Sequence, residues 1–390
     1  MLIPEASWQI PSQLFIEHDE ITAQWLDEQI PESLKATWQD LGQSGHSSGS
    51  GHLSIDYALI VKQGIHGVLA KLDQPTVQTL KSQTTRKAMR LTCEALIKWA
   101  NRLADHAQQL ADTCDDPTLA TCHQRVANAC RHVPQYPARD LFEALQSMML
   151  IHLSLALEGQ GLSISIGLPD RALDAFIHQV DEDFQGSVQL IRAFLVGIAS
   201  NSYTGRGSKT QAITLGGALP DESDAANSVT LAFLHAFEQT PVADPHCFFR
   251  WHPNVDSAIW DKVIALLSKG RSMPLLVNDQ QVVPGLVASG ITKDDAWNYC
   301  VVGCNELGIP GRLSECSACY GLYFNDLKLL NEGIRQNPDT FKNTQQIVEH
   351  WGQAFENAIS RSMPHRTKQL HHHRETLPMM VTSCFCHGCA

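Results

Sequence analysis

Residues 297–312 read WNYCVVGCNELGIPGR, and this segment is the most informative part of the sequence for the fold. It contains a short apolar strand, residues 300–302, which stops at Gly303 and presents Cys304 at the start of a turn. Glu306 follows two residues later, and further glycines let the chain bend away. A thiol at the end of a strand, on a tight loop, is placed for reaction rather than for packing.

Spacing alone fits Cys304 equally well to a buried structural cysteine and to a reactive one. Glu306 favours the reactive interpretation, because a carboxylate that points the same way as a thiol offers a base beside a nucleophilic or hydrogen-transferring group. Cys304 and Glu306 are therefore the candidate catalytic residues.

Around this loop, short runs of strand character alternate with helical segments. We expect strands at residues 162–166, 212–215, 247–251, 275–278 and 300–302. Apolar residues at three- and four-residue spacing predict helices over 82–114 and 137–157. This alternation is typical of an α/β fold with a largely parallel sheet. We expect a mainly helical N-terminal part, residues 1–135, and one continuous domain with the cysteine loop, residues 136–390.

Composition and charge exclude several classes of protein. With 43% apolar and 18% charged residues, the 390-residue chain is neither disordered nor fibrous. A net charge of -12 argues against nucleic-acid binding, because a phosphate backbone needs a basic face. The sequence has no apolar run of the roughly 18 residues that span a membrane and no signal peptide. We expect a cytoplasmic protein whose 12 cysteines are reduced thiols.

The sequence resembles the pyruvate formate-lyase-like glycyl radical enzymes, whose cysteine loop has the pattern Gly-Cys-x-Glu found here at 303–306. Order and spacing agree with the family along roughly residues 20–389. The stretches that carry the resemblance are 51–57 (GHLSIDY), 137–139 (PAR), 143–147 (EALQS), 158–165 (EGQGLSIS), 215–217 (LGG), 224–227 (DAAN), 250–252 (RWH), 270–274 (GRSMP), 278–279 (ND) and 302–306 (VGCNE).

The resemblance implies a ten-stranded β/α barrel made of two half-barrels, with the cysteine loop threaded through its middle. In that family a glycyl radical oxidises the loop cysteine to a thiyl radical, which abstracts a hydrogen atom from the substrate. Cys304 matches this cysteine. Glu306 matches the base of the eliminating members, which removes a proton from the hydroxyl of the substrate radical. Pyruvate formate-lyase itself has two adjacent cysteines and no such glutamate, so a lyase or dehydratase is favoured over acyl transfer of the formate acetyltransferase type.

Three further residues are candidate substrate-binding residues by the same resemblance. Ser163 matches a serine that lines the pocket of the dehydratases, although the histidine usually found before it is Leu162 here. His52 and Ser317 match polar positions near the pocket. The alternative for each of the three is a structural polar group with its hydrogen bonds satisfied.

The sequence departs from the family after the point that matches residues 384–388. Family members continue there into a domain whose Arg-Val-x-Gly-Tyr-like loop holds the radical, whereas this sequence ends at Ala390. We expect a barrel that is incomplete at the C-terminus, with no cofactor bound directly and with the glycyl radical supplied in trans. The implied partners are a small-molecule substrate, an S-adenosylmethionine radical activase, a separate glycyl-radical subunit and a second copy of the chain.

Two other interpretations compete with an active split or truncated enzyme. A catalytically silent relative is less favoured, because the catalytic pair of the family is retained. A zinc-stabilised binding protein is suggested by two CxxC pairs, Cys316 with Cys319 and Cys386 with Cys389. The first pair falls in a segment that should line the barrel, and the distance between the pairs is not diagnostic. We therefore expect no metal.

Overall fold

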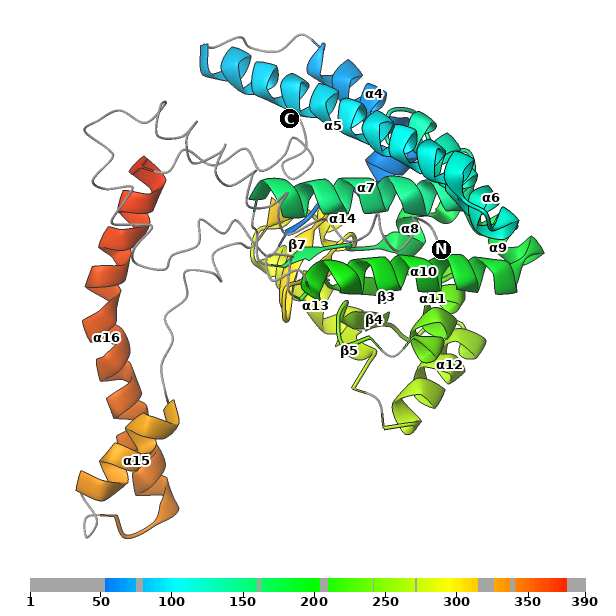
Figure 1. Ribbon diagram of the computed structural model, residues 1–390. Helices are drawn as coiled ribbons and strands as arrows, with labels where there is room; N and C mark the ends of the chain where they lie inside the picture. Colours follow the sequence, from blue (N-terminus) through cyan, green and yellow to red (C-terminus); the bar gives the residue numbers. More distant parts are fainter. Residues whose placement is uncertain are drawn as a thin grey trace. The chain divides into compact units, whose positions relative to one another are not determined.

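The computed structural model describes residues 53–74, 80–159, 163–203, 210–240, 242–270, 272–314, 326–336 and 341–376 (Figure 1). These residues fall into two compact units, divided between Cys316 and Ser317. The first unit contains all the described strands. The second contains two helices that pack on each other, α15 (Asp326–Gln336) and α16 (Thr344–Thr376). The expected boundary at residue 135 stays a prediction.

Five short strands of the first unit lie side by side in chain order, and all run parallel. One bridge, between Gly167 and Ile213, joins the pair β1–β2 to the set β3–β4–β5. The α/β class with a parallel sheet is thereby confirmed. The parallel set within the described residues has five strands, half of the ten expected, so a closed barrel stays a prediction. The strands are β1 (Leu53–Ser54), β2 (Ile164–Ser165), β3 (Ile213–Gly216), β4 (Cys247–Trp251) and β5 (Leu275–Asn278).

The strands differ in how far they are covered. All four residues of β3 and the first four of β4 are buried, as is usual for parallel strands with both faces covered. By contrast, β5 pairs only with β4 among the described residues, and its Leu275 and Leu276 are 40% and 49% exposed. In the described part of the sheet, the outer edge of β5 therefore has no partner strand.

Helices pack in sequence around the sheet and form the core with it. Contacts link α7 (Leu141–Gly159) to α10 (Phe184–Tyr203), then to α11 (Ser228–Gln239) and α12 (Ser257–Ser268). Figure 1 shows α7 and α10 running alongside each other. Large side chains that are fully buried fill the interior, among them Phe194, Phe233 and Phe249. The remaining described helices of this unit are α4 (Tyr57–Leu72), α5 (Leu80–Thr113), α6 (Pro117–His132), α8 (Pro169–Ala172), the short 3-10 helix Asp174–Phe176, α9 (Ile177–Glu182), α13 (Asp279–Ala288) and α14 (Lys293–Ala296).

Side-chain caps explain where the predicted helices begin and end. The helix expected over 82–114 is α5, and α6 follows it directly because the carboxylate of Asp116 accepts from the backbone N–H groups of Thr118 and Leu119. The helix expected from residue 137 begins four residues later, at Leu141. Its cap is Asp140, which accepts from the backbone N–H of Glu143 at 2.8 Å.

The expected strand 300–302 is β6 (Cys300–Val302), but it stands outside the parallel sheet. It pairs antiparallel with β7 (Glu306–Ile309), which pairs in turn with β8 (Leu313–Ser314). The hairpin contacts β1, β2 and β3. Where the structure describes the chain, none of its helices could cross a bilayer.

Candidate active site

Cys304 and Glu306 lie together at the tip of the β6–β7 hairpin. The three residues of β6 are buried, whereas Cys304 and Asn305 are exposed. Gly303 begins the turn with a φ of 60°, a backbone conformation that favours glycine. One oxygen of the Glu306 carboxylate, Oε2, accepts hydrogen bonds from the backbone N–H groups of Cys304 at 2.9 Å and Asn305 at 3.1 Å. The carboxylate is therefore held against the backbone of the cysteine.

Two buried hydroxyl groups fix the hairpin on the parallel strands. The backbone N–H of Val301 donates to Oγ1 of Thr214 in β3 at 2.9 Å, and that of Gly303 donates to Oγ of Ser165 in β2 at 3.3 Å. The same Ser165 oxygen accepts from the backbone N–H of Ala212 at 3.1 Å. Cys304 therefore follows directly after a residue anchored to β2.

Ser163 lies immediately before β2, two residues from the serine that holds Gly303. It is 3% exposed, and its hydroxyl is hydrogen-bonded to that of Thr210, just before β3. Both residues have positive φ values, 67° and 60°, although neither is glycine. Strained backbone of this kind is often found at functional sites.

The other sequence candidates are not part of this geometry. His52, Ser317 and the four cysteines of the suggested zinc site lie outside the described residues, so their roles stay predictions. Within the described part of the chain, no group of three or more His, Cys, Asp or Glu side chains could hold a metal ion.

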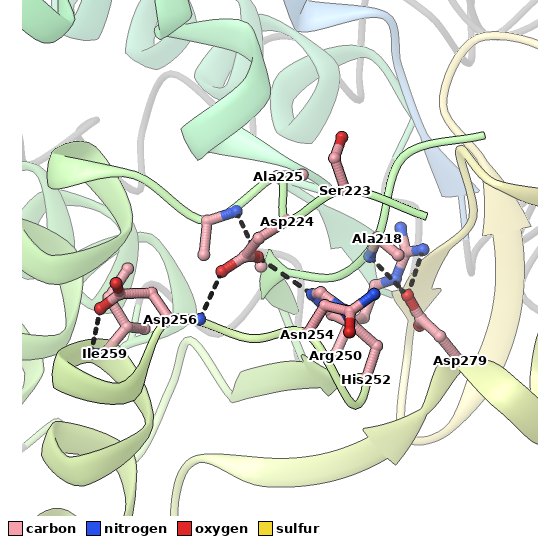
Figure 2. A network of polar contacts seen from close by, with 12 residues as sticks. Ala218, Ser223, Asp224, Ala225, Arg250, His252, Asn254, Asp256, Ile259 and Asp279 are labelled. Atoms are coloured by element: carbon pink, nitrogen blue, oxygen red, sulfur yellow. Dashed lines mark hydrogen bonds and ion pairs between the residues drawn. The ribbon is translucent and has the colours of Figure 1, made fainter. Parts of the chain in front are cut away.

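A buried ion pair lies behind the hairpin, at the C-terminal ends of β4 and β5 (Figure 2). Arg250 is fully buried and donates through Nε and Nη2 to the two carboxylate oxygens of Asp279, both at 2.9 Å. The hydroxyl of Tyr299 and the backbone N–H of Ala218 donate to the same carboxylate at 2.5 and 2.8 Å. Burial opposes the charged form, but Arg250 and these donors outweigh it and hold the pKa of Asp279 below its ordinary value.

The same arginine holds the chain at the entrance to β6. Its Nη1 donates to the backbone carbonyl oxygens of Trp297 at 3.1 Å and Tyr299 at 3.0 Å, and its guanidinium carbon lies 3.9 Å from the centre of the Tyr299 ring. Arg171 donates to the Trp297 carbonyl as well, at 3.0 Å. Gly217 leaves room for this arrangement, since a Cβ there would lie 2.5 Å from Nε of Arg250. The segment that leads into the cysteine loop is thus held in place by the guanidinium groups of Arg250 and Arg171.

A second polar network ties together the loops that follow β3 and β4. Asp224 contacts Nε2 of His252 at 3.0 Å and accepts from the backbone N–H of Asp256 at 2.7 Å and of Ala226 at 2.9 Å. Figure 2 shows it beside the Arg250–Asp279 pair. The matching stretches 224–227 and 250–252 therefore contain residues that join loops.

Sequence reasoning quoted Arg250 and Asp279 within matching motifs but gave them no role. The available signal was a charged residue inside an apolar strand, which has to find a partner when the strand is buried. Thr214 and Ser165 carry a weaker signal of the same kind, because each is a hydroxyl residue next to apolar residues in a short strand.

The comparison with protein families decides the identity of this fold. Residues 15–390 match the family model described as pyruvate formate lyase-like. The chain belongs to the pyruvate formate lyase-like family. The resemblance inferred from the sequence is thereby confirmed.

Curated relatives within this family include lyases and dehydratases. The isethionate sulfite-lyase of Bilophila wadsworthia (strain 3_1_6) is 30% identical over 294 residues, which cover 69% of this chain and 35% of the relative. The (2S)-3-sulfopropanediol dehydratase of Klebsiella oxytoca is 26% identical over 382 residues, 88% of this chain and 46% of the relative. The chain thus spans less than half the length of these two relatives.

Solved structures of other proteins share the fold of this chain. A glycyl radical enzyme from Archaeoglobus fulgidus superposes with a TM-score of 0.73 at 18% identity, covering 91% of this chain and 50% of the other. A structure reported on 1,2-propanediol dehydration in Roseburia inulinivorans gives a TM-score of 0.72 at 22% identity, covering 87% and 46%. At these identities the likeness concerns the fold alone.

Proposed function

We propose that this chain forms the cysteine-loop part of a glycyl radical lyase or dehydratase that acts on a small hydroxylated substrate. The observation that carries the proposal is the contact between the Glu306 carboxylate and the backbone of Cys304 at the exposed tip of the hairpin. Curated relatives named as lyases and dehydratases support it. The stretch Cys304-Asn305 has no second, adjacent cysteine, which supports elimination rather than acyl transfer.

The reaction would use Cys304 and Glu306 in turn. Cys304, as a thiyl radical, takes a hydrogen atom from the carbon that bears the substrate hydroxyl, so an S–H bond forms as the C–H bond breaks. The Glu306 carboxylate accepts the hydroxyl proton, and a group on the neighbouring carbon leaves with its bonding electron pair while a C=O bond forms. If hydroxide leaves, it takes up the proton from Glu306 as water. The product radical then recovers the hydrogen atom from Cys304, which restores the thiyl radical.

A glycyl radical, when present, supplies the oxidation of Cys304. The residues fit this role, because the cysteine is exposed and can be approached by a group that belongs to another polypeptide segment. We place the radical in trans, installed by an S-adenosylmethionine radical activase, with no other cofactor. Ser163, His52 and Ser317 are the proposed substrate-binding residues, and an anaerobic cytoplasm is the proposed location.

The test is an anaerobic electron paramagnetic resonance experiment on the full chain with a radical activase, with and without a separate glycyl-radical polypeptide. We expect a glycyl doublet and consumption of a small hydroxylated substrate only when that polypeptide is present. Cys304→Ala should then abolish turnover and leave the doublet, whereas the control Ser154→Ala, on α7, should change neither. A doublet with full turnover in the Cys304→Ala variant would reject the proposal.

A further inference from the structure

β6 is held by a regular series of contacts along one edge. Its other edge pairs with β7, where Cys300 and Val302 lie opposite Gly308 and Glu306. Within the described residues, no strand pairs with the first edge. Side chains of the parallel strands take the place of a strand there, and each contact on this edge falls two residues after the last.

The series starts at the entrance of β6 and ends beside Cys304. Arg250 donates hydrogen bonds to the backbone carbonyl oxygens of Trp297 and Tyr299, at 3.1 and 3.0 Å. Further along, Thr214 accepts a hydrogen bond from Val301 N–H at 2.9 Å, and Ser165 accepts one from Gly303 N–H at 3.3 Å. Backbone groups two residues apart lie on the same edge of a strand, so the contacts at Tyr299, Val301 and Gly303 share one edge of β6. The contact at Trp297, in the turn that follows α14, fixes the segment just before the strand.

We propose that Arg250, Thr214 and Ser165 are positioning residues that set the register of β6 and thereby the place of Cys304. A slip of one residue would move the cysteine by about 3.4 Å and turn its side chain to the opposite face. Transfer of an atom requires reacting atoms within roughly 3–3.5 Å, so such a slip would separate the sulfur from its substrate. The inference rests on the proposed function for what Cys304 does, but the register itself can be tested without any radical.

The two hydroxyl groups suit this task because of their burial. Thr214 and Ser165 are both fully buried. A hydroxyl oxygen has two acceptor positions, and Ser165 uses both, for Ala212 N–H and Gly303 N–H. Without these acceptors, the N–H groups of Val301 and Gly303 would be buried without a partner in this register. Their loss therefore favours other registers or an open hairpin.

Cys300 offers a readout of the register. It is fully buried, and burial raises the pKa of its thiol to about 12, so iodoacetamide should leave it unmodified near neutral pH. Cys304, by contrast, is exposed. Trypsin cuts after Lys293 and Arg312, so a single peptide reports the modification of both thiols. A hairpin that slips or opens exposes Cys300.

The experiment is timed alkylation of the full chain followed by mass spectrometry of peptide 294–312. In the wild-type chain only Cys304 should be modified. Thr214→Val should speed modification of Cys300 about five-fold, the effect of one net hydrogen bond. Ser165→Ala removes the acceptor of both Gly303 N–H and Ala212 N–H, so it should speed the modification by about five-fold or more. The double variant should speed it by roughly 25-fold or more if the two effects are independent. Thr214→Ser, which restores a hydroxyl, should return the rate toward that of the wild type.

Internal controls separate register from general stability. Cys130 and Cys247 are buried elsewhere in the first unit and should stay unmodified in every variant. Ser154→Ala is the matched control, since this hydroxyl donates to the Ile151 carbonyl of its own helix. Faster modification of Cys130 and Cys247 together with Cys300, or an unchanged rate at Cys300, would overturn the proposal. An inactive chain in the radical experiment would leave this result unaffected.

Discussion

Replacing Asp279 by asparagine tests how strongly the buried ion pair stabilises the first unit. The side chains of Arg250 and Asp279 are 0% and 1% exposed. Asparagine keeps one acceptor oxygen but sets an NH₂ group against a guanidinium N–H, so the arginine charge loses its partner. Breaking a buried pair by removing one member costs about 3–5 kcal/mol. We therefore expect Asp279→Asn to destabilise the unit by about that amount.

The assay follows alkylation of Cys247, a fully buried thiol of β4, in increasing urea. When the unit recloses faster than it reacts, the alkylation rate measures the population of the opened form. A loss of about 3–5 kcal/mol corresponds to a rate increase of roughly two to four orders of magnitude. This probe reports on the first unit alone, which matters because a chain with two units does not unfold in one step.

The variant Asp105→Asn, which removes one member of an exposed ion pair, is the control for this prediction. Asp105→Asn breaks the ion pair of Asp105 with Arg131, whose side chains are 63% and 46% exposed. Exposed pairs contribute only about 0–1 kcal/mol. If Asp279→Asn accelerates alkylation no more than Asp105→Asn does, the buried pair does not stabilise the unit in the way described.

The remaining predictions concern backbone, catalysis and pH. Gly217→Ala should destabilise the first unit by about 1–3 kcal/mol in the same assay, because the φ of Gly217 is 91° and the new Cβ would meet a guanidinium nitrogen of Arg250. The control Gly285→Ala places its Cβ in open space within a helix, so it should be neutral or stabilising. Glu306→Gln should lower turnover of the complete enzyme by about 10²–10⁴ while the glycyl doublet persists; unchanged turnover would remove Glu306 as the base. Hydrogen bonds from lysines, Lys262 first, hold the pKa of Glu238 at about 2. The stabilising effect of the Glu238 carboxylate should be complete above the unfolded pKa of about 4.3 and be lost as the pH falls toward 2. The difference in urea midpoint between Glu238→Gln and the wild type should therefore shrink over that pH range. A constant difference would contradict the lowered pKa.

Local signals in the sequence predicted much of the fold. The strands 247–251, 275–278 and 300–302 appear with the bounds expected, because short apolar runs between turn residues are typical of strands. The closeness of Cys304 and Glu306 also follows from sequence, since the two residues flank one tight turn. Elements of two residues, such as β1 and β8, are too short to show any periodicity.

The rest depends on contacts between distant segments. Nothing near Trp297 in the sequence indicates that Arg250 holds its carbonyl, because the two residues meet only after β4 and the hairpin are in place. The hydroxyls of Thr214 and Ser165 gain their meaning in the same way, from the strand that packs against them. The predicted start of α7, Pro137, is four residues too early, because the helix begins after its carboxylate cap, Asp140, and not at the proline.

The outer edge of β5 has a consequence for the handling of this protein. In the part of the chain that the structure describes, β5 pairs only with β4, and its Leu275 and Leu276 are exposed. An edge strand of this kind is a template on which other strands can add. Two copies that pair through this edge would form a closed dimer, because the same edge is used on both chains. A lysine in place of Leu276 would protect the edge at little cost to the core, since nearly half of that side chain already faces solvent.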